Sequence, residues 1–242
     1  MTAEAARRAP GQWRSFVRAV HPRQALAFAV AVGTLVALTG RPVREIVVSA
    51  ATVLVAQLIM GLVNDLFDVD RDRMGGASNK PIAEGIIPKG NASFAIAVLL
   101  LLVIPLSLQN GIEAGLFALA TLPVGYLHNR WLHTTPLSWF GWSATFALLT
   151  FFVTYGGWGR EAGGSAPLTN FVLLCAALGF CVHFLTSLPD LVVDNQARVR
   201  HLPLRIALRT GATRLMIVTI LLTVVVLTAI VYTTAQAGAI AQ

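Results

Sequence analysis

Long apolar runs separated by short polar segments make up most of this chain. A helix that crosses a bilayer needs about 20 mostly apolar residues, and seven runs come near that length. The pattern therefore predicts an all-α protein, a polytopic transmembrane bundle of about seven helices. The predicted spans cover residues 24–40, 45–66, 92–109, 113–128, 137–156, 168–189 and 213–235.

The composition supports an integral membrane protein. Hydrophobic residues make up 56% of the 242-residue chain and charged residues 12%, whereas soluble domains carry about 25% charged residues. The two cysteines, Cys175 and Cys181, lie in one apolar run and match neither a disulfide framework nor a metal-binding spacing. No cleavage site follows a short apolar core near the N-terminus, so we expect no cleaved signal peptide.

The net charge of +7 is better explained by membrane topology than by nucleic-acid binding. With seven spans and a cytoplasmic N-terminus, fifteen of the 18 basic residues fall on the cytoplasmic side. We therefore expect a multi-pass cell-membrane protein with its N-terminus inside and its C-terminus outside. The expected divisions are a basic N-terminal segment (1–23), one transmembrane domain (24–235) and a tail (236–242). The inner basic residues are Arg7, Arg8, Arg14, Arg18, Arg23, Arg71, Arg73, Lys80, Lys89, Arg130, Arg198, Arg200, Arg205, Arg209 and Arg214.

All six aspartates follow two of the predicted spans, and this topology places both groups on the cytoplasmic side. After the second span, Asn64, Asp68 and Asp72 are spaced i, i+4 and i+8, so on a continuing helix they share one face. Asp65 lies beside that face, and Asp70 points elsewhere. After the sixth span, Asp190 and Asp194 repeat the i, i+4 spacing.

Carboxylates close to a bilayer are costly and are usually functional. Hard oxygen ligands select Mg²⁺ or Ca²⁺, and Mg²⁺ is commonly shared between one or two carboxylates and substrate phosphates. Two such groups with basic residues nearby suit a Mg²⁺-bound diphosphate. The alternative is a solvated acidic loop in which the first group pairs with Arg71 and Arg73.

These residues resemble the motifs of the UbiA-type intramembrane prenyltransferases. The first family motif, N-D-x-x-D-x-x-x-D, matches "NDLFDVDRD" at 64–72, and the basic-Pro segment matches "NKPIAEGIIPKG" at 79–90. The second motif, D-x-x-x-D followed by a Thr-Leu-Pro-like stretch, matches "DLVVDNQARVRHLPLRIA" at 190–207. "YLHNRWLHTTPLSWFGW" at 126–142 is similar to the stretch after the family's fourth helix.

The resemblance implies helices around a central cavity and an enzyme that transfers a prenyl group from an isoprenyl diphosphate. It implies Mg²⁺ as cofactor, the bilayer as environment, and an aromatic, quinone-precursor-like or other lipid-soluble acceptor. By the same resemblance, five residues hold Mg²⁺ and the diphosphate: Asn64, Asp68, Asp72, Asp190 and Asp194. Asp65 is a further ligand or an orienting neighbour, and Lys80, Arg130, Arg23 and Arg198 are the candidate diphosphate contacts. Membrane anchoring explains Arg23 and Arg198 about as well.

The chain departs from the family pattern in the second motif, where Arg198 and Val199 replace Gly-Lys and His201 replaces Thr. Only one predicted span, 213–235, follows that motif, where family members commonly have three. Other functions therefore stay open: a membrane terpene cyclase, a phosphoribosyl transferase and a divalent-cation transporter. The five histidines lack metal-ligand spacing and are expected mainly at the surface or in the core, although a phosphate contact is open for His133 and His201.

Overall fold

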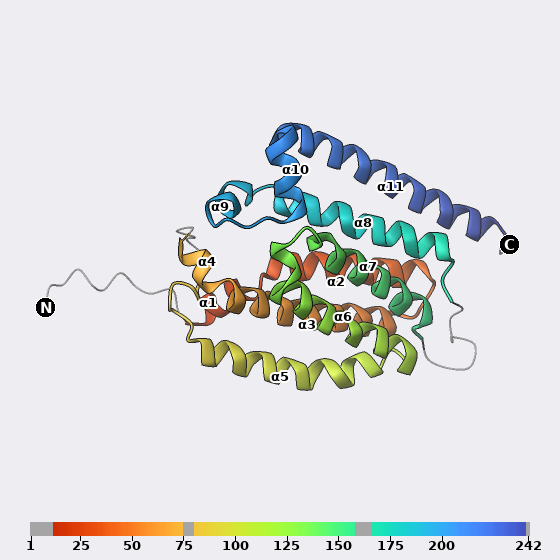
Figure 1. Ribbon diagram of the computed structural model, residues 1–242. Helices are drawn as coiled ribbons and strands as arrows, with labels where there is room; N and C mark the ends of the chain where they lie inside the picture. Colours follow the sequence, from red (N-terminus) through yellow and green to blue (C-terminus); the bar gives the residue numbers. More distant parts are fainter. Residues whose placement is uncertain (1–11, 75–79, 158–165, 241–242) are drawn as a thin grey trace, which may run out of the picture. The chain divides into compact units, whose positions relative to one another are not determined.

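The structure, a computed structural model, describes residues 12–74, 80–157 and 166–240 (Figure 1). Arg7, Arg8 and Arg160 of the topology prediction lie outside these ranges, as does the first part of the predicted N-terminal segment. Within them all regular structure is helical, as the apolar runs predict. The chain divides into two compact units, Met1–Leu106 and Ser107–Gln242, whereas the single-domain division of the sequence stays a prediction.

The first unit holds four helices and most of a fifth. They are α1 (Gln12–Ala19), α2 (Pro22–Leu38), α3 (Val43–Phe67), α4 (Val69–Met74) and α5 (Lys89–Leu108). The second unit holds α6 (Ile112–Arg130), the 3₁₀ turn η1 (Leu132–Thr134), α7 (Ser138–Tyr155), α8 (Thr169–Ser187), α9 (Leu191–Gln196), α10 (Leu202–Thr210) and α11 (Ala212–Ile240).

One long helix lies in each of the seven apolar runs: α2, α3, α5, α6, α7, α8 and α11. In the described part of the chain, four helices are long and apolar enough to cross a membrane: α3, α5, α8 and the Ala212–Ala235 portion of α11. The chain is thus a multi-pass membrane protein. Seven crossings and the N-in orientation stay predictions.

In the first unit α3 packs along α2. Of the four candidate spans it is the most enclosed, because 44% of its apolar window is buried, compared with 17% for α5. An apolar cluster closes the end of α3 that carries the first acidic group. It joins Ala19, Leu62, Val69, Ile82, Ile87 and Ala92. This cluster holds α1, α4 and the 80–88 loop against the last turns of α3.

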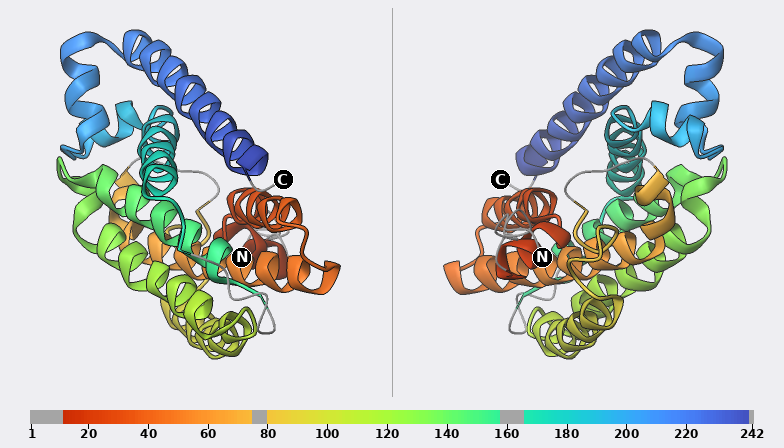
Figure 2. Two further views of the ribbon diagram at one scale, coloured as in Figure 1. Left: turned by 90° about the vertical axis from the view of Figure 1, so that its right-hand side faces the viewer. Right: turned by 90° about the vertical axis from the view of Figure 1, so that its left-hand side faces the viewer.

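In the second unit consecutive helices pack as neighbours, α6 on α7 and α7 on α8, and α11 returns along α8 (Figures 1 and 2). Two glycines allow the helices to approach closely, as small residues do in membrane bundles. A Cβ at Gly141 would lie 2.6 Å from Cβ of His128, and one at Gly179 would lie 2.6 Å from the carbonyl oxygen of Trp142.

Apolar-run length did not predict the short helices α1, α4, α9 and α10, because each has between six and nine residues. On α10, Pro203 and Leu204 are buried while Arg205 and Arg209 are exposed. These segments connect the long helices and carry parts of both acidic motifs. The last helix, α11, continues to Ile240, beyond the predicted end at 235.

Candidate active site

The first acidic motif lies where α3 ends. Asp68 is the C-cap residue, with φ −90° and ψ 2°, so the helix is interrupted there and resumes as α4. The i, i+4 contacts nevertheless continue across the break. The backbone N–H of Asp68 donates to the carbonyl of Asn64 (2.9 Å), and that of Asp72 donates to the carbonyl of Asp68 (2.8 Å). In addition, Asn64 Nδ2 donates to Asp68 Oδ2 (3.0 Å), which joins the three motif residues.

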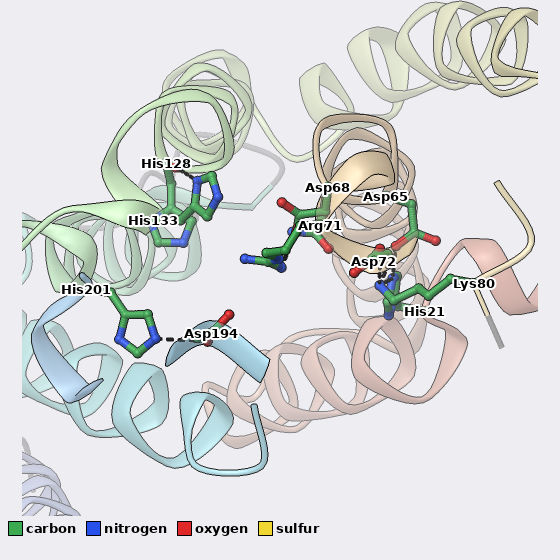
Figure 3. A network of polar contacts seen from close by, with 11 residues as sticks. His21, Asp65, Asp68, Arg71, Asp72, Lys80, His128, His133, Asp194 and His201 are labelled. Atoms are coloured by element: carbon green, nitrogen blue, oxygen red, sulfur yellow. Dashed lines mark hydrogen bonds and ion pairs between the residues drawn. The ribbon is translucent and has the colours of Figure 1, made fainter. Parts of the chain in front are cut away.

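Asp65 is the most enclosed carboxylate of the motif, with 2% of its surface exposed. Its Oδ1 accepts from Lys80 Nζ at 2.6 Å and from His21 Nε2 at 2.8 Å (Figure 3). Lys80 Nζ also lies 3.6 Å from Asp72 Oδ2. Lys80 therefore bridges two carboxylates of the motif and offsets part of the repulsion between them.

A close approach of two backbone segments brings His21 to Asp65. His21 is the N-cap of α2 and adopts the left-handed conformation, with φ 48° and ψ 56°. The turn lies against Gly61, one helical turn before Asp65 on α3. A Cβ at Gly61 would lie 2.9 Å from the carbonyl oxygen of Val20 and 3.2 Å from the His21 ring. Only glycine leaves room for this contact without a shift of the backbone.

The loop from Lys80 to Pro88 is folded tightly, and this fixes the position of the Lys80 backbone. Pro81 and Ile82 are fully buried, and the N–H groups of Ile86 and Ile87 both donate to the carbonyl of Pro81. Gly85 supplies the positive φ of 76° that the turn needs. From α4, Arg73 Nε donates to the carbonyl of Ala83 at 2.9 Å, so the loop is held to the helix that carries Asp72.

Arg71 is the second cation that contacts these carboxylates, and its Nη2 donates to Asp68 Oδ2 at 2.5 Å. The sequence suggested Arg71 only as a partner in the solvated-loop alternative. That alternative does not describe Asp68, which is 3% exposed. It does describe Asp70, whose side chain is 90% exposed and lies 3.9 Å from Arg73. The helical spacing correctly separated Asp70 from the others.

The motif offers oxygens for a cation. Among the described residues, buried Asp65 Oδ2 and Asp72 Oδ2 accept no hydrogen bond. Burial, together with the negative charges of Asp68 and Asp65, raises the pKa of Asp72, although Lys80 and Arg71 act against this. In the same part of the chain no three His, Cys, Asp or Glu side chains converge as a ready-made metal site. Mg²⁺ needs no such cage when a substrate phosphate supplies ligands, so the oxygen donors fit it.

The second acidic motif lies in the other unit, at the turn between α8 and α9. Asp190 is exposed and is the N-cap residue of α9, and its carbonyl accepts the N–H of Asp194 at 2.8 Å. Asp194 is 6% exposed, and its Oδ2 lies 2.9 Å from His201 Nε2 (Figure 3). The i, i+4 pair therefore consists of one exposed and one enclosed carboxylate.

The three remaining candidate arginines are all exposed. Arg23 lies in the first turn of α2, and Arg198 lies in the turn after α9 with φ 56°. Arg130 ends α6, and its guanidinium carbon lies 5.4 Å from the centre of the Trp131 ring. The contacts above link Asn64, Asp65, Asp68, Asp72 and Lys80 to one another. The roles of these three arginines stay predictions.

Two histidines contact the acidic motifs, although the sequence predicted mainly surface or core roles for histidine. His21 contacts Asp65, which is 44 residues away in the chain, and no local signal marks that pairing. His201 precedes a Leu-Pro pair that opens α10. Pro in the first turn is a helix-start signal and could have identified His201 as a cap seven residues after Asp194.

Comparison with known proteins identifies similar sequences. The model of the UbiA prenyltransferase family matches residues 25–241. The digeranylgeranylglyceryl phosphate synthase of Pyrococcus abyssi is 27% identical over 203 residues, which cover 82% of this chain and 71% of that protein.

Solved structures show the same fold. A UbiA homolog from Archaeoglobus fulgidus bound to GPP and Mg²⁺ superposes with a TM-score of 0.70 at 16% identity, covering 92% of this chain and 85% of that one. The same homolog bound to DMAPP and Mg²⁺ gives 0.69 at 17% identity, covering 88% and 75%. A digeranylgeranylglyceryl phosphate synthase structure gives 0.60 at 19% identity, covering 88% and 76%.

Proposed function

Because this chain belongs to the UbiA prenyltransferase family and is a prenyltransferase, we propose that it is Mg²⁺-dependent and that both of its acidic motifs bind one isoprenyl diphosphate. The acceptor is a lipid-soluble molecule, and the site opens at the cytoplasmic surface. Family membership favours an enzyme over the cation-transporter alternative.

The observation that carries the proposal is the enclosed group Asp65, Asp68 and Asp72 with its own cations. Buried carboxylates are retained only when they are paired or bind a cation. Here Lys80 and Arg71 pair with them, yet two buried carboxylate oxygens accept no hydrogen bond from the described residues. Such a site can release its cations to phosphate oxygens while the carboxylates take a divalent ion.

The residue roles follow from this exchange. Asn64, Asp68 and Asp72 hold the metal and diphosphate from the first motif, and Asp65 stays with His21 to orient the group. Asp190 and Asp194 contribute from the second motif. Lys80 and Arg71 turn to the diphosphate oxygens, and Arg130, Arg23 and Arg198 are the further candidate contacts. When bound, Mg²⁺ supplies positive charge that stabilises the departing diphosphate.

The proposed reaction breaks the bond between C1 of the prenyl chain and its diphosphate oxygen. The electron pair leaves with diphosphate, where Lys80 and Arg71 stabilise the added charge, and C1 becomes an allylic cation. A nucleophilic oxygen or carbon of the acceptor then bonds to C1 and loses a proton.

Two acceptor classes are proposed. The family resemblance favours an aromatic, quinone-precursor-like acceptor. The name of the Pyrococcus relative, digeranylgeranylglyceryl phosphate synthase, favours a prenylated glyceryl phosphate. Both carry a nucleophile on a polar group, which suits a site at the end of membrane helices.

Product analysis on the purified protein in liposomes tests the proposal. Geranyl, farnesyl and geranylgeranyl diphosphates are each incubated with Mg²⁺ and with a 4-hydroxybenzoate, a geranylgeranylglyceryl phosphate or no acceptor. We expect diphosphate release and one prenylated acceptor. A cyclic hydrocarbon formed without acceptor would instead identify a cyclase.

Asp68→Asn and Asp190→Asn provide the decisive variants, and Asp70→Asn provides the matched control because its side chain is 90% exposed. Diphosphate release at the normal rate by both motif variants would contradict the proposal. So would full release by the unmodified protein without any divalent ion.

A further inference from the structure

His201 connects the second acidic motif to the start of α10. It is 4% exposed, and both ring nitrogens make hydrogen bonds. The N–H of Leu204 donates to Nδ1 at 3.1 Å, and Nε2 lies 2.9 Å from Asp194 Oδ2. A nitrogen that accepts an N–H carries no proton, so the ring proton is on Nε2 and is donated to the carboxylate.

The first turn of α10 shows why this ring is fixed in place. Helix N-termini have N–H groups without partners inside the helix. Leu202 N–H donates to Ser138 Oγ at 3.3 Å, Pro203 has no N–H, and Leu204 N–H is satisfied by His201. The ring is therefore anchored through Nδ1 before it reaches Asp194.

Capping alone does not account for a histidine here. Ser, Thr, Asp and Asn are the preferred N-cap residues, and each is smaller than histidine. None of them, anchored at the cap, also extends to the position of Nε2. The longer imidazole extends far enough for its Nε2 to contact Asp194, which is itself 6% exposed. The His183 ring lies beside the His201 ring, with 6.5 Å between the ring centres and 73° between the ring planes.

We propose that His201 is a positioning residue that holds the Asp194 carboxylate in the orientation needed to bind the metal-diphosphate head. The proposal rests on the function proposed above, because it takes Asp194 as part of that site. Hydrogen-bonding partners of metal-ligating groups fix their orientation, and their loss costs about 10- to 100-fold in metal affinity or activity. Replacing His201 should therefore change metal use more than folding.

Two substitutions separate the two hydrogen bonds of the ring. In His201→Asn the amide oxygen takes the place of Nδ1, so the cap is kept and the bond to Asp194 is lost. In His201→Gln the amide nitrogen reaches toward the place of Nε2, so a donor to Asp194 is kept. Thr210→Ala is the control, because Thr210 is exposed at the other end of α10 and its hydroxyl donates to the Ile206 carbonyl of the same helix.

The probe is inorganic diphosphate, whose binding does not depend on prenyl length, titrated calorimetrically at a series of Mg²⁺ concentrations. We expect His201→Asn to raise the Mg²⁺ concentration needed for binding about 10-fold with an unchanged thermal unfolding midpoint. His201→Gln should recover most of the loss, and Thr210→Ala should bind normally. In an Asp194→Asn background, His201→Asn should add nothing, because the interacting partner is already gone.

Normal binding by His201→Asn, alongside weakened binding by Asp194→Asn, would overturn the positioning role and leave the proposed function intact. An effect of His201→Asn that persists in the Asp194→Asn background, or a lowered unfolding midpoint without rescue by glutamine, would also overturn it. Normal binding by Asp194→Asn would remove Asp194 from the site, and the positioning role with it.

Discussion

The two acidic motifs solve the problem of enclosed carboxylates in different ways. In the first, Asp65, Asp68 and Asp72 are offset by the formal positive charges of Lys80 and Arg71, with His21 as an added donor. In the second, Asp194 is held by an imidazole whose single ring proton lies on Nε2, so no cation is involved in that contact. Asp190 is exposed.

The difference suggests different roles for the two motifs under the proposed function. Cations that pair with carboxylates in the empty site are available to a substrate with several phosphate oxygens. A neutral hydrogen bond leaves the negative charge of Asp194 in place for a metal. In the proposed site the first motif supplies both signs of charge, and Asp194 of the second motif supplies negative charge in a fixed orientation.

The largest effect should come from removing one carboxylate of either motif. Asp68→Asn and Asp190→Asn each keep the side-chain shape but lose the charge that is proposed to bind Mg²⁺. We expect diphosphate release to fall by more than about 100-fold, beyond the loss typical of outer hydrogen-bonding partners. Radiolabelled diphosphate release measures it, with Asp70→Asn as the control. A strong loss in only one variant would show that the motifs do not share a substrate.

Lys80→Met tests whether the cations of the first motif serve both the empty and the occupied site. It leaves Asp65, which is 2% exposed, with less compensation. Breaking a buried ion pair destabilises a protein by about 3 kcal/mol or more, and diphosphate contacts are lost as well. We expect a lower thermal unfolding midpoint together with a higher KM for the prenyl diphosphate. Lys89→Met, at the exposed start of α5, is the control; an unchanged KM would confine Lys80 to a structural role.

Gly61→Ala should lower the thermal unfolding midpoint less than Lys80→Met does, and it should disturb the first motif but not the second. The new methyl group meets the Val20 carbonyl oxygen at 2.9 Å, so the turn that carries His21 must move. Overpacking of this kind costs roughly 1–3 kcal/mol. Gly90→Ala is the control because a Cβ there meets nothing within 4 Å. If both variants unfold at the same temperature, the close approach is not a constraint.

The smallest expected effect is the change in the thermal unfolding midpoint when divalent ions are removed. Since Lys80, Arg71 and His21 already contact the carboxylates of the first motif, removal of divalent ions with EDTA should stop catalysis but shift the unfolding midpoint by less than Lys80→Met does. Differential scanning fluorimetry with and without EDTA measures the shift. A large drop in the midpoint would show that the structure depends on metal and not on its own cations.

Apolar-run length predicted where the seven long helices lie, because membrane spans have a strong and local sequence signal. The i, i+4 spacing predicted the Asn64–Asp68–Asp72 contacts, even though the helix is interrupted at Asp68. The histidine partners of Asp65 and Asp194 were harder to predict from the sequence. His21 reaches Asp65 only because Gly61 admits a turn from 40 residues away, and His201 shows only a capping signal. Long-range packing decides such contacts, and no local pattern encodes it.

The internal ion pairs of the first motif bear on how the chain is made. Three carboxylates that reach a lipid bilayer without counter-ions would oppose insertion, and a protein that waited for magnesium would depend on the ion supply of the cell during synthesis. Lys80 and Arg71 belong to the same stretch of chain as the aspartates they pair with. Arg71 lies 3 residues after Asp68, and Lys80 lies 15 residues after Asp65 and 8 after Asp72. The nascent segment thus carries cations that offset part of this negative charge, and under the proposed function the metal is needed for catalysis and not for insertion.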